Sequence, residues 1–127
     1  MQRLIFPLPG NQAFAEQLAA AVDGELGSIE TRRFPDGECY VRLHGDPRGR
    51  AVDLVCTLAQ PDLQFLSLVF AADAARELGA SEVNLVAPYL AYMRQDKRFN
   101  PGESVTSLSF ARLLSSTFDA LLTSDPH

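Results

Sequence analysis

Two stretches of the sequence carry polar and aromatic side chains that neither a sheet nor a helix requires. The first, residues 32–38, reads Arg-Arg-Phe-Pro-Asp-Gly-Glu and places an aromatic ring between cations and carboxylates. Phe34 could stack on a planar base, while Asp36 and Glu38 could accept hydrogen bonds from an exocyclic amine or from ribose hydroxyls. The alternative interpretation, a charged hairpin tip that binds nothing, stays open on these residues alone.

The second stretch, residues 89–99, follows an apolar run at 83–87 and reads Tyr-Leu-Ala-Tyr-Met-Arg-Gln-Asp-Lys-Arg-Phe. Its positive side chains are those of Arg94, Lys97 and Arg98. An arginine guanidinium can hold two phosphate oxygens through parallel hydrogen bonds, and Gln95 could contact a base or a sugar. The alternative is a solvated loop whose charges balance through Asp96 and Glu103.

Short apolar runs alternate with helical patterns along the chain, and this alternation predicts an α/β fold with a mostly parallel sheet flanked by helices. The expected strands lie at 3–6, 28–34, 38–43, 51–58, 83–87 and 120–123. The expected helices lie at 12–22, 61–78 and 104–118. Asn11 is expected to cap the first helix. The helical spacing predicts one apolar stripe through Phe14, Leu18 and Val22, and another through Leu63, Leu66, Phe70, Ala74 and Leu78.

The elements expected around the two polar stretches give each of them a distinct position. The strands at 28–34 and 38–43 are joined across Pro35-Asp36-Gly37, and an Asp-Gly step is a strong hairpin signal, so a protruding β-ribbon is predicted. The second stretch follows a strand, and in an open α/β sheet ligands bind outside the carboxyl ends of the strands. We therefore expect it to line a binding site, with Tyr89 and Tyr92 as packing residues.

The composition excludes several classes of protein. A chain of 127 residues with 46% hydrophobic and 21% charged residues fits one compact globular domain. The net charge of -5, without any run of Lys or Arg, argues against a nucleic-acid partner. Cys39 and Cys56 lack metal-binding spacing and fit reduced thiols in a cytoplasm. No apolar stretch approaches the roughly 20 residues of a membrane span, so no membrane partner is expected.

The two polar stretches resemble the ATP-contact motifs of the ribose-phosphate pyrophosphokinases. The matching strings are residues 33–38 and 88–97, in the order and at the separation that the family has. Arg48-Gly49 before a strand, and Ser124-Asp125-Pro126-His127 after one, resemble further landmarks, so the resemblance spans nearly the whole chain. The family joins two similar domains of the phosphoribosyltransferase type, and this sequence resembles only the first.

The resemblance implies transfer of the diphosphoryl group of ATP to the C1 hydroxyl of ribose 5-phosphate, giving phosphoribosyl diphosphate and AMP, with Mg²⁺ required. The implied ATP-binding residues are Phe34, Asp36, Gly37, Glu38, Arg94, Gln95 and Asp96. His127 matches the histidine that contacts magnesium in the family. The ribose-phosphate loop and the catalytic lysine of the family belong to the second domain, so no catalytic residue is expected here.

Residues 1–127 are therefore expected to form the N-terminal, ATP-binding half of a cytoplasmic enzyme, without the C-terminal domain that binds ribose 5-phosphate. This half is expected to be inactive alone. The resemblance further implies a homo-oligomer in which the ribbon of one subunit reaches the nucleotide site of its neighbour.

Two other classes of function remain open. A non-catalytic regulatory paralogue would assemble with active enzymes, but it would have no physical reason to keep the Arg94-Gln95 pair and the Asp36/Glu38 pair. An unrelated, flavodoxin-like nucleotide-binding module would be favoured by a glycine-rich loop after the first strand. Residues 7–10 read Pro-Leu-Pro-Gly, without a GxGxxG pattern.

Overall fold

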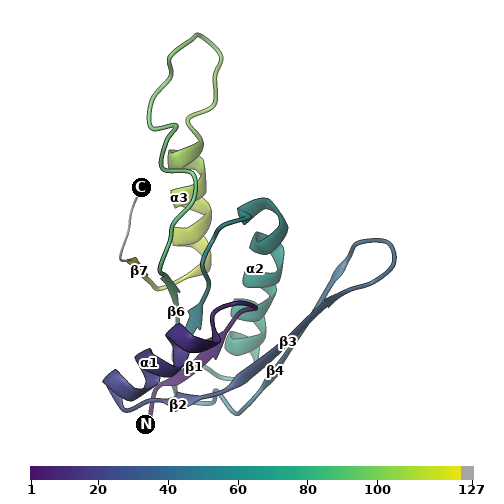
Figure 1. The fold of residues 1–127 in the computed structure, drawn as a ribbon, viewed down its shortest axis with the longest axis vertical. Coiled ribbons are helices and arrows are strands. Elements are labelled where there is room, and N and C mark those ends of the chain that lie inside the picture. Colours follow the sequence, from purple (N-terminus) through teal and green to yellow (C-terminus); the bar gives the residue numbers. More distant parts are fainter. Residues whose placement is uncertain (124–127) are drawn as a thin grey trace.

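A five-stranded parallel sheet forms the centre of the chain, with the strand order β2-β1-β5-β6-β7 (Figure 1). The structure, a computed structural model, describes residues 1–123. The strands are β1 (Leu4–Pro7), β2 (Glu25–Leu26), β5 (Ala51–Val55), β6 (Glu82–Ala87) and β7 (Ala120–Thr123). The central strands β1, β5 and β6 are buried almost throughout, as their largely apolar sequences favour, and the buried Asn84 of β6 donates a hydrogen bond to the buried Asp53 of β5. The predicted α/β class with a mostly parallel sheet is confirmed.

Three helices cover the two faces of this sheet. They are α1 (Gln12–Val22), α2 (Pro61–Glu77) and α3 (Thr106–Thr117). On one face, Ile5, Val55 and Val86 pack with α1. On the other, strand residues such as Phe6 and Leu85 pack with α2 and α3. Among the described residues, no helix is long and apolar enough to cross a membrane.

A separate antiparallel ribbon of β3 (Ser28–Arg33) and β4 (Cys39–His44) protrudes from this body (Figure 1). Its tip closes through hydrogen bonds from the Phe34 amide to the Glu38 carbonyl and from the Gly37 amide to the Phe34 carbonyl, both 2.8 Å long. Gly37 has a φ of +95°, a conformation that side chains rarely adopt, so glycine is required at this position. The predicted ribbon is confirmed.

The side chain of Asn11 does not cap α1, so this prediction was wrong. Its carboxamide oxygen accepts hydrogen bonds from the amide and the hydroxyl of Thr57, each 2.9 Å long. Its carboxamide nitrogen donates to the carbonyls of Leu8 and Pro9. Because the loop after β5 offers these partners to a buried side chain, Asn11 joins the loops that follow β1 and β5 instead of capping a helix.

The apolar stripe predicted for α2 is not the face that this helix buries, and of the stripe predicted for α1 Leu18 packs on the core while Phe14 and Val22 stay exposed. Buried positions are held largely by alanines: Ala15 and Ala19 in α1, and Ala71, Ala72 and Ala75 beside Leu68 in α2. Small side chains let a helix approach a sheet closely, which close-packed interiors favour. Phe14 of α1 remains 38% exposed, and Leu63 and Leu66 of α2 remain 61% and 56% exposed. The predicted stripe of α2 is thus an apolar surface that no other part of residues 1–123 covers fully.

Candidate functional site

The loop between β6 and α3 begins at the carboxyl edge of the sheet and extends well beyond it (Figure 1). Its first part is held at two points. The amide of Leu58, in the loop after β5, donates a 3.2 Å hydrogen bond to the carbonyl of Tyr89. The amide of Ser107, at the start of α3, donates a 3.2 Å hydrogen bond to the carbonyl of Gln95. These bonds fix the backbone on both sides of the predicted phosphate-binding residues.

A cavity of about 330 Å³ lies at this edge, between the loop after β5, the loop after β6 and the start of α3. Its lining residues are Ala59, Pro61, Tyr89, Ala91, Tyr92, Met93, Arg94, Gln95 and Thr106. Arg94 is exposed, and its guanidinium has no hydrogen bond or ion pair to any residue within 1–123. Arg94 and Gln95, which are adjacent in the sequence, thus line one cavity, and the positive charge of Arg94 is available to bind an anion.

The remaining charged groups of this loop serve its own structure. The carboxylate of Glu103 accepts hydrogen bonds from the amides of Phe99 and Asn100, and the bond from Asn100 lowers the pKa of this carboxyl. Arg98 donates to the carbonyl of Glu103. The ammonium of Lys97 lies 5.5 Å from the centre of the Phe99 ring. These contacts order the outer loop, but no ion pair joins its charged side chains within 1–123, so the alternative of charges balanced through Asp96 and Glu103 is not supported there.

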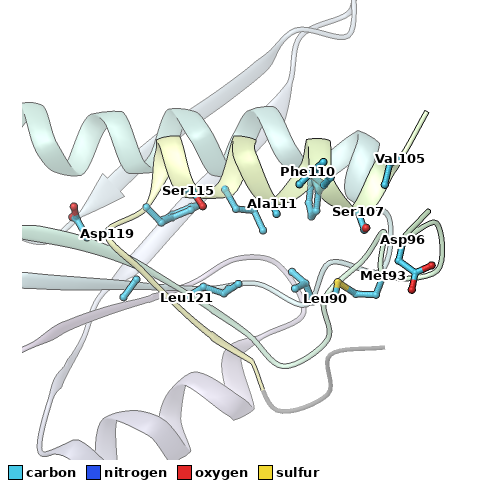
Figure 2. Close-up of a pocket in the computed structure, with 14 residues that line it drawn as sticks. Leu90, Met93, Asp96, Val105, Ser107, Phe110, Ala111, Ser115, Asp119 and Leu121 are labelled. Carbon is cyan, nitrogen blue, oxygen red and sulfur yellow. The ribbon is translucent and has the colours of Figure 1, made fainter. Parts of the chain in front are cut away.

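Asp96 lines a different and larger cavity, of about 630 Å³, between α3 and β7. Figure 2 shows Asp96 and Ser107 near one end of this cavity, with apolar side chains such as Leu90 and Leu121 along it. These apolar walls suit a phosphate group poorly, because a charged group without partners is costly to desolvate. The structure does not place Asp96 in the same cavity as Arg94 and Gln95.

The ribbon tip presents an aromatic ring beside carboxylates. Phe34, Asp36, Gly37 and Glu38 are all exposed. The Phe34 ring meets the Tyr40 ring edge-on at 6.2 Å between centroids, and the guanidinium of Arg32 lies 4.4 Å from the centre of the Tyr40 ring. The carboxylate of Asp36 accepts a 3.1 Å hydrogen bond from the amide of Glu38. This arrangement can stack on a planar base and accept hydrogen bonds from it.

Within one chain, the structure does not bring the two predicted parts of the site together. The ribbon tip and the loop after β6 project on different sides of the first turn of α2 (Figure 1). Arg33 ties the ribbon to this turn by donating to the carbonyl of Leu63, and it closes the tip with a 2.8 Å bond to the carbonyl of Gly37. His127, the predicted metal contact, lies outside the described residues.

The described residues give little support to a nucleophilic cysteine or to a metal site formed by protein side chains. Burial raises the pKa of the Cys56 thiol to about 12, so this thiol stays protonated and is not a nucleophile. Cys39 and Cys56 are both free. No group of three or more His, Cys, Asp or Glu side chains within 1–123 is arranged to hold a metal ion.

Sequence reasoning missed two pairs of residues that shape the carboxyl edge. One is Asn11 with Thr57, which joins the loops after β1 and β5. The other is Tyr92, whose hydroxyl donates a hydrogen bond to the carboxylate of Asp62. Each pair contains a polar residue that follows a strand at the edge of the sheet where ligands bind, and this position in the sequence could have marked these residues as part of the site.

The sequence and the fold both have known relatives. Residues 3–117 match the family model described as the N-terminal domain of ribose phosphate pyrophosphokinase. A ribose-phosphate pyrophosphokinase of Methanopyrus kandleri is 45% identical over 112 residues, which cover 87% of this chain and 38% of that protein. One of Halobacterium salinarum is 38% identical over 117 residues, covering 92% of this chain and 41% of that protein. The chain thus spans less than half the length of these relatives.

Solved structures share the fold at lower sequence identity. The phosphoribosylpyrophosphate synthetase of Mycobacterium smegmatis superposes with a TM-score of 0.79 at 20% identity, over 98% of this chain and 49% of that one. A purine phosphoribosyltransferase of Pyrococcus horikoshii superposes with a TM-score of 0.58 at 14% identity, over 98% of this chain and 75% of that one. The predicted phosphoribosyltransferase-like fold is confirmed.

Proposed function

We infer that this chain, which belongs to the family of the N-terminal domain of ribose phosphate pyrophosphokinase, is the ATP-binding part of an enzyme that makes phosphoribosyl diphosphate. The proposed reaction transfers the diphosphoryl group of ATP to the C1 hydroxyl of ribose 5-phosphate and releases AMP. The observation that carries the proposal is the guanidinium of Arg94, which has no partner within 1–123 and lies beside Gln95 in a cavity at the carboxyl edge of the sheet.

Arg94 is proposed to hold the phosphates of the nucleotide. Its planar guanidinium can donate two parallel hydrogen bonds to phosphate oxygens, and Gln95 can contact the nucleotide beside it. Phosphoryl transfer depends chiefly on positioning and on positive charge near the transferring group, so it requires no nucleophilic side chain. The protonated thiol of Cys56 is consistent with this scheme. The proposed role of the chain is therefore to bind the nucleotide and to orient its phosphates.

Magnesium is proposed as the cofactor, although the described residues do not form a magnesium site by themselves. Mg²⁺ commonly keeps several waters and is bound by one or two carboxylates together with substrate phosphates. Asp96 is a carboxylate close to Arg94 in sequence, but it lines a different cavity. The proposed ligands are thus the phosphates of the nucleotide and residues such as His127, outside 1–123. When bound, the ion would neutralise charge on the transferring group.

The base of the nucleotide is proposed to bind the ribbon of a second copy of the chain. Phe34 would stack on adenine, while Asp36, Gly37 and Glu38 would contact the base and ribose. The projection of the ribbon tip and the loop after β6 on different sides of α2 within one chain supports this arrangement (Figure 1). The exposed leucines of α2, Leu63 among them, supply apolar surface next to the ribbon for a contact between subunits. A two-fold axis would let each ribbon serve the opposite site.

Ribose 5-phosphate is proposed to bind a second domain, in the part of the relatives that this chain does not match. The chain alone would then bind ATP without converting it, because the acceptor is not held in place. The free thiols of Cys39 and Cys56 fit the cytoplasm, which we propose as the location.

Calorimetric titration of the 127-residue chain with ATP and magnesium tests the proposal. Arg94→Ala is expected to weaken ATP binding about tenfold or more, because hydrogen bonds to charged groups contribute roughly 1.5–3 kcal/mol. Arg112→Ala is the matched control, since Arg112 is exposed on α3 and has no side-chain partner within 1–123. Equal ATP affinity in the wild type and Arg94→Ala would contradict the proposed site. Formation of AMP from ATP and ribose 5-phosphate by this chain alone would contradict the proposed division of roles.

A further inference from the structure

Tyr92 adopts a backbone conformation that is rare for an aromatic residue. Its φ is 62°, in the left-handed region where a side chain crowds its own carbonyl group. Within residues 1–123, the other non-glycine residue with positive φ is Asp23, which ends α1 in the left-handed conformation common at helix C-termini. Tyr92 ends no helix, so its conformation has another cause.

The side chain of Tyr92 connects the loop to the helices on both sides of it. Its hydroxyl donates a hydrogen bond to the carboxylate of Asp62 in the first turn of α2. Its ring lies 5.0 Å from the ring of Phe110 in α3, at an interplanar angle of 52°. Strained residues persist where their surroundings over-determine them, and they cluster at functional sites. The contacts with Asp62 and Phe110 supply this constraint.

The constrained turn lies two residues before Arg94 in the sequence. The backbone is hydrogen-bonded at Tyr89 on one side and at Gln95 on the other. Between these points, Tyr92 is the residue whose side chain is fixed to both helices. Arg94 is exposed and has no partner within 1–123, so its own contacts do not direct it. The backbone that carries Arg94 is therefore held between the turn at Tyr92 and the hydrogen bond at Gln95.

We propose that Tyr92, held by Asp62, is a positioning residue that directs Arg94 into the nucleotide cavity. This inference rests on the proposed function, because the role of Arg94 comes from there. Tyr92 acts through Arg94 and contacts no phosphate itself. If the hydrogen bond to Asp62 is lost, ATP must order the turn as well as the guanidinium, and binding weakens although every nucleotide contact remains possible.

The test compares the affinities of the 127-residue chain for ATP and for adenosine by calorimetric titration. Tyr92→Phe keeps the ring on Phe110 and removes only the hydroxyl, whereas Asp62→Ala removes the acceptor. Both are expected to weaken ATP binding about two- to tenfold, the range for one hydrogen bond, and to leave adenosine affinity unchanged. Asp62→Asn keeps an acceptor oxygen and is expected to bind ATP like the wild type. Asp73→Ala, at an exposed position of α2, is the matched control.

The same variants in an Arg94→Ala background show whether Tyr92 affects ATP binding through Arg94. Tyr92→Phe is expected to cause no further loss of ATP affinity there, because the guanidinium that it directs is gone. If Tyr92→Phe lowers ATP affinity equally with and without Arg94, the proposal is overturned. It is also overturned if Arg94→Ala weakens ATP binding but Tyr92→Phe alone leaves ATP affinity unchanged. That second result would leave the proposed function standing. A wild-type chain that binds no ATP would overturn the proposed function, and this inference with it. Thermal unfolding midpoints of the variants that match the midpoint of the wild type exclude a general loss of structure as the cause of weaker binding.

Discussion

Mixing two defective variants tests whether one nucleotide site is built from two copies of the chain. Phe34→Ala removes the ring of the ribbon tip, and Arg94→Ala removes the guanidinium of the loop after β6. The ribbon tip and the loop after β6 project on different sides of α2 in one chain (Figure 1). In a two-fold dimer that pairs the ribbon of one copy with the loop of the other, each variant alone has two damaged sites. Coexpression with different affinity tags gives all three combinations of subunits.

The expected recovery follows from this geometry. A mixed dimer has one site with both residues intact and one site with both changed. Random pairing makes about half of the dimers mixed, so about a quarter of all sites should bind ATP with wild-type affinity. Calorimetry on the doubly tagged fraction should give about one high-affinity site per dimer. Absence of such a site, or a strictly monomeric chain with full ATP affinity in sedimentation, would refute the shared site.

Three further outcomes are expected. Arg94→Lys should lose much of the ATP affinity that Arg94→Ala loses in titration, because lysine cannot reproduce a planar two-point contact. Asn11→Ala should lower the free energy of unfolding in urea by roughly 2–4 kcal/mol, at about 1 kcal/mol for each hydrogen bond. Asn11→Ser, a good helix cap, should not restore it, and restoration would argue for capping. Burial raises the pKa of Asp53, so the ionisation of Asp53 destabilises the fold as pH rises through that raised pKa. The hydrogen bond from the Val83 amide lowers the pKa of Asp119, so the ionised Asp119 carboxylate stabilises the fold, and this stabilisation is lost as pH falls below the ordinary pKa of an aspartate. In unfolding titrations, Asp53→Asn should therefore gain stability relative to the wild type as pH rises, and Asp119→Asn should lose it.

The sequence predicts those parts of the fold that depend on local chemistry. The Asp36-Gly37 step defines the ribbon because the turn needs a positive φ, which the +95° of Gly37 provides. The central strands could be recognised because strands buried on both faces are largely apolar. The carboxyl edge could be predicted as the place of the site because loops follow parallel strands there. Arg94 and Gln95 meet at that edge for the same reason.

Long-range contacts limit what the sequence predicts. The side chain of Asn11 bonds to Thr57, which is 46 positions away, and nothing local distinguishes this role from capping. The buried face of α2 consists largely of alanines such as Ala71 and not of the larger apolar residues of the predicted stripe, because the sheet lies close to the helix. The left-handed conformation of Tyr92 arises from contacts with elements that are distant in the chain. In each case the partner, and not the residue type, decides the outcome.

The first turn of α2 gives a physical reason why one chain would not complete the proposed nucleotide site by itself. Arg33 ties the ribbon to this turn at the carbonyl of Leu63, and Tyr92 ties the loop after β6 to it at the carboxylate of Asp62. Both parts are thus attached to one helix, with the ribbon tip and the loop on different sides of it (Figure 1). Closing the ribbon over the loop would break the Arg33 contact and the packing of the ribbon on the core. A second copy can supply a ribbon without breaking either, so association is the less costly way to complete the proposed site.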